Sequence, residues 1–214
     1  MKKIIAATRN AHKIKEIEAI TKDFGMEIIS RDDAGIPKIE IEEDGKTFEE
    51  NSYKKAFGIM KLADEITIAD DSGLVVDCLG GAPGIYSARF AAFPGIWPGE
   101  DAGNEDSSDQ DNNSKLIRLI SDTPYEERTA RFVSVITMVY PDGETIVARG
   151  EVEGHLVLEE RGYCGFGYDP LFVPVGYDKT FGELSSEIKN SISHRANALK
   201  ALRVKLAEKE KQVE

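Results

Sequence analysis

Two adjacent carboxylates, Asp70 and Asp71, are the residues of this chain best suited to chemistry. They follow an apolar run that ends at Ala69 and precede Ser72-Gly73, so we expect them at a strand end, ahead of a turn. Carboxylates in such a position can hold a hard divalent cation and accept a proton from water. The alternative is that the pair only marks the turn, because Asp and Gly are common turn residues.

A second candidate segment lies where a predicted strand, residues 2–7, passes into a predicted helix. It consists of Thr8, Arg9, Asn10, Ala11, His12 and Lys13. The N–H groups at the start of a helix favour phosphate, and Lys13 adds a positive charge. The segment is neither a Walker A sequence nor a dinucleotide fingerprint. Phosphate binding and simple helix capping therefore both remain open.

An acidic run around Glu42 and Glu43 precedes a helix that Thr47 is expected to cap. Such a run is typical of solvated surface. A cation held by Asp71 would nevertheless need further oxygen ligands, and Mg²⁺ takes one or two carboxylates together with water and phosphate. The helix after Thr47 has a predicted apolar face made of Tyr53, Ala56, Phe57, Met60 and Ala63.

Glycines alternate with aromatic residues in the segment 162–170, and a polar stretch, 189–196, follows it. Glycines let the backbone approach a flat ligand while a ring stacks on that ligand. The alternative is a glycine-rich turn that packs Phe166 and Tyr168 into the core. His194 and Arg195 offer hydrogen-bond donors suited to a carbonyl or a phosphate, although such a pair is also common on plain surface.

The composition predicts a self-contained folded protein: 214 residues, 41% hydrophobic and 31% charged. The formal charge of −12 makes polymeric nucleic acid an improbable partner. No run approaches the roughly 18 apolar residues of a membrane span, and the N-terminus turns polar too early for a signal peptide, so we expect a cytoplasmic protein. Cys78 and Cys164 are interpreted as ordinary buried thiols, with neither zinc nor a disulfide.

Hydrophobic periodicity predicts alternating strands and helices within a single domain, residues 1–214. A strand near residues 27–30 follows the first helix, and strands 129–140 and 145–153 form a hairpin around Pro141-Asp142-Gly143. The Gly-, Pro- and Asp-rich stretch 93–113 is predicted to be a mobile surface loop, followed by helices at about 113–120 and 185–207. The charged tail, 208–214, is expected to fray.

Six blocks together resemble the inosine triphosphate pyrophosphatase family. In chain order they are Thr8-Arg9-Asn10 with Lys13, Thr47-Phe48-Glu49-Glu50-Asn51, Ala69-Asp70-Asp71-Ser72-Gly73-Leu74, Gly81-Ala82-Pro83-Gly84-Ile85-Tyr86-Ser87-Ala88-Arg89, Gly165-Phe166-Gly167-Tyr168-Asp169-Pro170 and Ser193-His194-Arg195-Ala196. They cover nearly the whole chain in order, which is far more specific than any single block.

The resemblance implies an α/β fold with a mixed sheet, in which two lobes flank a central substrate cleft, and usually a homodimer. It also implies Mg²⁺-dependent hydrolysis of non-standard purine nucleoside triphosphates, those of inosine, deoxyinosine and xanthosine, to monophosphate and pyrophosphate. In that scheme Asp71 is the general base, and Glu42 and Asp71 hold the metal. Substrate is bound by Thr8 to Lys13, Lys55, Ser72, Phe166, Gly167, Tyr168, Asp169, Lys189, His194 and Arg195.

This chain departs from the family pattern at two places. Arg9 stands where the family usually has glycine, which puts the affinity of the phosphate loop in question, and the stretch 93–113 is longer than the usual connection. Separately, Lys54 beside Lys55 blurs the register of the phosphate lysine. Two alternative functions remain: a nucleotide sensor without turnover, and a pyrophosphatase that prefers modified pyrimidines.

Overall fold

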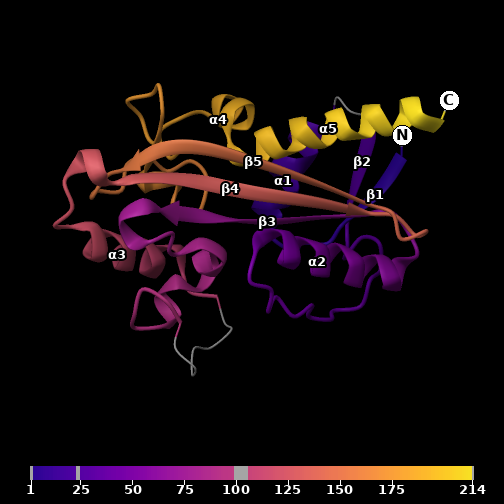
Figure 1. Ribbon diagram of the computed structural model, residues 1–214, viewed down its shortest axis with the longest axis horizontal. Helices are drawn as coiled ribbons and strands as arrows, with labels where there is room; N and C mark the ends of the chain where they lie inside the picture. The colour runs from indigo at the N-terminus through magenta and orange to yellow at the C-terminus, as the bar shows by residue number, and fades with distance from the viewer. Residues whose placement is uncertain (1, 23–24, 99–105, 214) are drawn as a thin grey trace. The chain divides into compact units, whose positions relative to one another are not determined.

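The protein is an α/β protein built on a mixed sheet. The computed structural model describes residues 2–22, 25–98 and 106–213 (Figure 1). The strands are β1 (Lys2–Ala6), β2 (Met26–Ser30), β3 (Thr67–Val76), β4 (Thr129–Val139), β5 (Thr145–Leu156) and β6 (Phe172–Pro174). The α-helices are α1 (Ala11–Thr21), α2 (Phe48–Ala63), α3 (Asp109–Ile120), α4 (Ser186–Ile192) and α5 (His194–Val213). Short 3-10 helices are η2 (Asp77–Leu79), η3 (Gly84–Ala92), η4 (Tyr125–Glu127) and η5 (Asp169–Leu171).

Within the described residues the strands form one six-stranded sheet in the order β2-β1-β3-β4-β5-β6. β1 pairs in parallel with both β2 and β3, while β5 and β6 are antiparallel. The parallel pairs belong to the strand–helix–strand part of the chain, where α1 and α2 provide the crossovers that parallel strands require. The mixed α/β class predicted from the sequence is therefore confirmed.

The chain divides into two compact units. The first comprises residues 1–71, 134–150 and 194–214, and the second comprises residues 72–133 and 151–193. The boundary crosses β3 between Asp71 and Ser72. Each unit has its own hydrophobic core and is described separately below.

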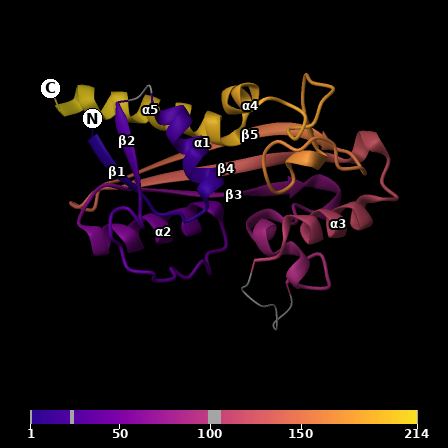
Figure 2. The same cartoon turned by 180° about the vertical axis from the view of Figure 1, so that it is seen from behind.

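In the first unit, alternate residues of β1 and β3 face different helices. Ile4 and Ile68 pack in one cluster with Leu199 of α5, whereas Ile5 and Ala69 pack in another cluster with α2. Figures 1 and 2 show α1 and α5 on one side of these strands and α2 on the other. Because successive strand residues point to opposite faces, Asp70 and Asp71 must also point to opposite faces.

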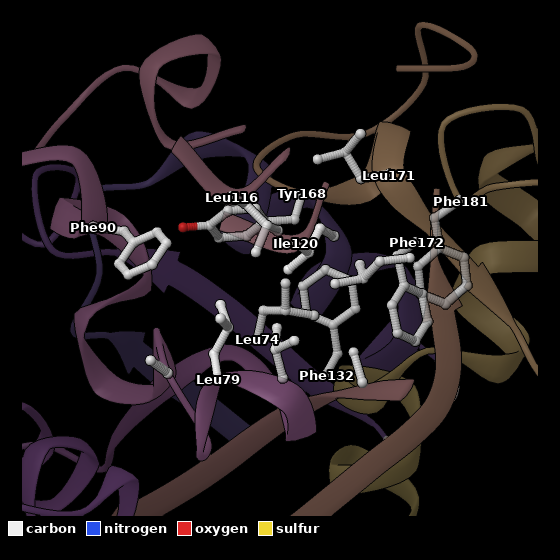
Figure 3. Close-up of a cluster of buried hydrophobic side chains, with 14 of the residues drawn as sticks. Leu74, Leu79, Phe90, Leu116, Ile120, Phe132, Tyr168, Leu171, Phe172 and Phe181 are labelled. Atoms are coloured by element: carbon white, nitrogen blue, oxygen red, sulfur yellow. The ribbon is translucent and has the colours of Figure 1, made fainter. Parts of the chain in front are cut away.

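The second unit packs around a core of large aromatic and aliphatic side chains. Phe132, Phe172 and Phe181 pack ring against ring, with centroid separations of 4.7 to 6.1 Å. Leu116 and Ile120 of α3 are fully buried in the same cluster (Figure 3). α3 is therefore anchored to this core along its C-terminal half.

Local signals predicted most element boundaries well. Thr47 caps α2 by accepting a hydrogen bond from the N–H of Glu50 at 3.1 Å, as expected. The predicted helix near residue 185 is divided at Ser193 into α4 and α5, and α5 continues to Val213, so residues 208–213 are helical. Phe24, which the apolar spacing of the first predicted helix includes, lies outside the described residues.

Four predictions need correction. β3 is continuous from Thr67 to Val76, so the two aspartates lie inside a strand rather than at its end. The predicted loop 93–113 gives way to helix at Asp109, because Ser108 caps α3. Tyr53, predicted to belong to the apolar face of the helix after Thr47, is 41% exposed. Cys78 and Cys164 are exposed free thiols, not the buried thiols predicted from the sequence.

Among the described residues, no helix is long and apolar enough to cross a membrane.

Candidate active site

Asp70 is the centre of a buried ion network on the α1/α5 face of the first unit. Its Oδ2 accepts hydrogen bonds from the ammonium group of Lys13 at 2.9 Å and from the guanidinium group of Arg195 at 3.0 Å. Its Oδ1 accepts from the hydroxyl of Ser134 at 2.5 Å. Arg195 also pairs with Glu16, which lies one helical turn from Lys13 on α1. The four charged groups therefore form a neutral cluster that connects β3, α1 and α5.

Asp71 meets a different partner on the α2 face. Its Oδ1 accepts from the ammonium group of Lys55 at 2.7 Å, and the same ammonium group donates to Glu43 at 2.9 Å. Both Asp71 and Lys55 are buried. Oδ2 of Asp71 has no hydrogen-bond partner in the described structure, although it is inaccessible to solvent. One oxygen of this carboxylate is thus left without a hydrogen-bond partner in the described part of the protein.

The α2 helix places Lys55 at the site and keeps Lys54 away from it. Its buried face carries Asn51, Ser52 and Lys55 in addition to apolar residues, whereas Lys54 is exposed and pairs with Asp44. Ser52 donates to the carbonyl of Ala69, next to the aspartates. Of the two neighbouring lysines, it is therefore Lys55 that lies beside Asp71.

The pKa values of the two aspartates move in opposite directions. Burial alone would raise the pKa of Asp70, but Arg195 and Lys13 hold it well below its usual range. For Asp71 burial is the largest effect and raises the pKa, while Lys55 and Lys13 oppose it and the negative charge of Glu43 adds to it. Asp70 is therefore a fixed anion, and Asp71 is the carboxylate with the greater tendency to take up a proton.

The segment Thr8 to Lys13 forms the start of α1, as predicted. Asn10 caps the helix by accepting from the N–H groups of His12 and Lys13, at 3.0 and 3.2 Å. Thr8 in turn accepts from the N–H of Asn10. Capping is thus confirmed for this segment. The extra cation, Arg9, is exposed and lies 3.6 Å from Asp32.

His194 and Arg195 begin α5, and both are buried. The alternative that this pair lies on plain surface is therefore wrong. Arg195 could meet a substrate only by exchanging one of its carboxylate partners, because its side chain is fully buried against Asp70 and Glu16. The start of α5 is held close to β5 by Gly150. A Cβ atom at that position would lie 2.1 Å from the N atom of Ala198 and 2.4 Å from the carbonyl oxygen of His194.

In the second unit, the turn at 165–169 is organised around the carboxylate of Asp169. Its Oδ2 accepts from the N–H of Phe166 at 2.8 Å and from the ammonium group of Lys189 at 2.7 Å. That ammonium group also lies 5.0 Å from the centre of the Phe166 ring. Gly165, with φ of +85°, has no room for a side chain, because a Cβ would lie 2.0 Å from Asp169 Oδ2. Phe166, Asp169 and Lys189 are therefore brought together as predicted.

Tyr168 belongs to the core rather than to a stacking surface. Its ring is 4% exposed and lies among Phe90, Leu116 and Ile120 (Figure 3). Its hydroxyl donates to the carbonyl of Ser87 at 2.8 Å. Of the two aromatic side chains in the turn 165–169, Phe166 is half-buried and Tyr168 is buried. Ser72 is half-buried in β3.

Of the two glutamates in the acidic run, Glu43 shares Lys55 with Asp71, whereas the side chain of Glu42 is exposed. Four residues of these clusters escaped the motif analysis. Glu16, Ser134, Asp109 and Asn113 also contact site residues. The spacing of Lys13 and Glu16 on one helix face was a usable signal, but the partners of the other residues depend on contacts distant in sequence.

The carboxylates of the first unit can be tested for fit to a divalent cation. No group of three or more His, Cys, Asp or Glu side chains gathers in the described ranges. Mg²⁺ needs only one or two carboxylates, since water and phosphate complete its six ligands. The buried, unpartnered Oδ2 of Asp71, with Glu43 nearby, fits that requirement.

Comparison with known proteins gives a consistent result. The family model described as "Ham1 family" matches residues 4–205. A curated relative from Clostridium perfringens named "dITP/XTP pyrophosphatase" is 49% identical over 209 residues, covering 95% of this chain and 96% of its own length. A relative of the same name from Desulforamulus reducens is 45% identical over 92% of each chain.

A solved structure agrees with these relatives. The Ham1 protein of Staphylococcus aureus superposes with a TM-score of 0.79 at 41% identity, covering 97% of this chain and all of that chain. The family resemblance inferred from the six sequence blocks is confirmed. The family model and the relatives show that this chain belongs to the Ham1 family.

Proposed function

We propose that this protein is a pyrophosphatase that hydrolyses non-standard purine nucleoside triphosphates, with dITP and XTP as its main substrates and ITP as a further one. The products are the nucleoside monophosphate and pyrophosphate. The observation that carries the proposal is the buried Asp71, which is bonded to Lys55 through one oxygen and has its other oxygen unpartnered. The names of relatives that are 45–49% identical support the substrate class.

In this proposal the first unit performs the phosphate chemistry. Asp71 accepts the proton of the attacking water, because its pKa is raised above that of an ordinary carboxyl group. Lys13 and Lys55 balance charge that develops on the phosphate oxygens. Asp70 acts through Lys13 and is a positioning residue, since its own oxygens are occupied by Lys13, Arg195 and Ser134.

The second unit supplies base recognition in the proposal. Phe166 presents its ring to the purine, and Lys189 and Asp169 offer a donor and an acceptor beside it. Arg195, predicted from sequence to read the 6-keto group, can do so only after it releases Asp70 or Glu16. A keto-specific site would reject adenine, because an amino group would face donors.

Mg²⁺ is the cofactor we propose, held by Asp71 with Glu43 and, as the motifs suggest, Glu42. When bound, it supplies positive charge that polarises the phosphate oxygens. We further propose a homodimer located in the cytoplasm.

The test is to incubate the purified protein with dITP, XTP, ITP, dATP and dGTP, with Mg²⁺ or with excess chelator, and to separate pyrophosphate from orthophosphate. We expect pyrophosphate from the first three substrates, and only when the metal is present. An Asp71→Asn variant is the matched control for contaminating activity. Release of orthophosphate, or equal consumption of dATP, would contradict the proposal.

Two alternatives make different predictions in the same assay. A nucleotide sensor would release no more than one pyrophosphate per protein, whereas an enzyme releases an excess. An enzyme selective for modified pyrimidines would ignore dITP. The available oxygen of Asp71 favours turnover over sensing, because a sensor needs no carboxylate positioned to accept a proton.

A further inference from the structure

The backbone N–H and the backbone carbonyl of Gly167 are each bonded to a side chain of α3. Its N–H donates to Asp109 Oδ2 at 2.7 Å, and its carbonyl accepts from Asn113 Nδ2 at 3.2 Å. Asp109 and Asn113 are four residues apart, so both side chains project from the same face of the helix. Two side chains of one helix thus hold the donor and the acceptor of a single residue.

These two hydrogen bonds, called the Gly167 clamp below, come from the firmly anchored helix α3. Ser108 caps α3, and Leu116 and Ile120 fix its C-terminal half in the core. Asn113 is 3% exposed, and its Nδ2 also donates to Glu160 at 2.8 Å, so two acceptors flank the amide nitrogen. Asn113 Oδ1 has no hydrogen-bond partner in the described structure. The side-chain amide of Asn113 therefore acts here as a hydrogen-bond donor, through its nitrogen.

Phe166 precedes Gly167 in the chain, and its half-buried ring is the one that the proposed function assigns to the purine base. Its N–H is held by Asp169, and Asp169 is held by Lys189. On the C-terminal side of Phe166, its own carbonyl accepts from the N–H of Asp169 at 3.3 Å, and the next residue, Gly167, is held by Asp109 and Asn113 of α3. Gly167 has a φ of +62°, and no atom lies within 4 Å of the position that a Cβ would take. No side-chain packing at this residue therefore helps to fix the turn.

We propose that Asp109 and Asn113 are positioning residues for base selection, which hold Gly167 so that the Phe166 ring and the Asp169 carboxylate keep the spacing that a 6-keto purine requires. The inference rests on the proposed function. A loosened turn would bind the preferred and the rejected base with more similar affinity, because discrimination depends on fixed polar geometry. The phosphate chemistry of the first unit would be unaffected.

The experiment compares Asp109→Ala and Asn113→Asp with the wild type. We measure the ratio of kcat/KM for dITP over dATP and, by calorimetry, which needs no turnover, the ratio of the Kd for dAMP over the Kd for dIMP. Each variant is expected to lower both ratios by about fivefold, the effect of one lost hydrogen bond, through KM rather than kcat. A role limited to folding would change the unfolding midpoint and leave the ratios unchanged.

Two matched variants sharpen the test. Asp109→Asn keeps an oxygen acceptor for the N–H of Gly167 and should retain the wild-type ratios, whereas Asn113→Asp replaces the donor by an acceptor that faces a carbonyl. Asp111→Ala removes a carboxylate from the same first turn of α3 without touching Gly167 and should also retain them.

The outcomes separate the inference from the proposed function. Unchanged ratios in Asp109→Ala and Asn113→Asp, with folding intact, overturn the inference, as does an equal loss in Asp111→Ala. A wild-type protein that prefers dIMP over dAMP but releases no pyrophosphate overturns the proposed hydrolysis and leaves the clamp supported if the binding ratio still falls in the variants.

Discussion

Asp70 and Asp71 are neighbours in β3, yet they bind cations on opposite faces of the sheet. Asp70 meets Lys13 of α1 and Arg195 of α5, while Asp71 meets Lys55 of α2. The alternation of side chains along a strand separates two identical carboxylates into different surroundings. A pair that looks like one metal site in the sequence is thus divided into a buried anion held by two cations and a carboxylate with one oxygen that has no hydrogen-bond partner in the described structure.

This division predicts different effects of the same substitution. Asp70→Asn leaves Arg195 and Lys13 without their shared buried anion, so we expect a loss of about 3–5 kcal/mol in the free energy of unfolding. Asp71→Asn should change stability much less, because Lys55 keeps Glu43, but it should lower kcat by about 100-fold or more. Urea unfolding and initial rates measure the two effects. Equal stability losses in both variants would contradict the division.

The two neighbouring lysines of α2 offer a matched pair. Lys55→Met removes the cation between Asp71 and Glu43, and we expect kcat/KM for dITP to fall by about 100-fold. Lys54→Met breaks an exposed pair with Asp44, which contributes little, and should stay within about twofold of the wild type. Steady-state kinetics on both variants provides the check. A similar loss in the two would place the phosphate lysine elsewhere.

The Asp70–Arg195 pair should behave as one energetic unit. Arg195→Met leaves Asp70 and Glu16 with less positive charge and should also destabilise by about 3–5 kcal/mol. The double variant with Asp70→Asn should lose less than the sum of the two single variants, by about 1 kcal/mol or more. A double-mutant cycle in urea measures this coupling. Strict additivity would show that the pair is not coupled.

Alkaline stability should report on Tyr168. Burial, with a contribution from Asp109, raises the pKa of its hydroxyl far above the unfolded value of about 10, so the folded state keeps the proton that the unfolded state releases. Stability from this group is therefore present below pH 10 and is lost above it. Tyr168→Phe should be less stable than the wild type at pH 8, because the hydrogen bond to Ser87 is gone.

That difference should narrow above pH 10 by about 1.4 kcal/mol per pH unit, since phenylalanine does not ionise. Denaturant unfolding at pH 8 and pH 11 measures both values. A gap of constant size would show that the hydroxyl ionises as readily in the folded protein as in the unfolded chain.

What could be predicted from sequence follows from the range of the interactions involved. The Thr47 cap, the first strand and helix, and the hairpin at 141–143 depend on residues within one turn of one another, and all were predicted. The choice between Glu42 and Glu43 could not be predicted, because only the path of the chain before α2 decides which carboxylate reaches Lys55.

The helical start at Asp109 illustrates a second limit. Residues 93–113 have the composition of a loop, but Ser108 supplies a cap, and the C-terminal half of α3 packs into a core formed by distant strands. Likewise Tyr168 stands in a glycine-rich turn, yet packing with Phe90 and Leu116 takes its ring into the interior. Tertiary burial outweighed local composition in both cases.

Gly150 shows how far the chemistry depends on a residue without a functional group. The backbone of α5 approaches it so closely that one added methyl group would push the helix start, and Arg195 with it, away from β3. In a survey of every substitution along the chain, position 150 should therefore tolerate as little change as the aspartates. A sequence-based search for functional groups would overlook it, and an effort to stabilise this protein by replacing glycines should leave it untouched.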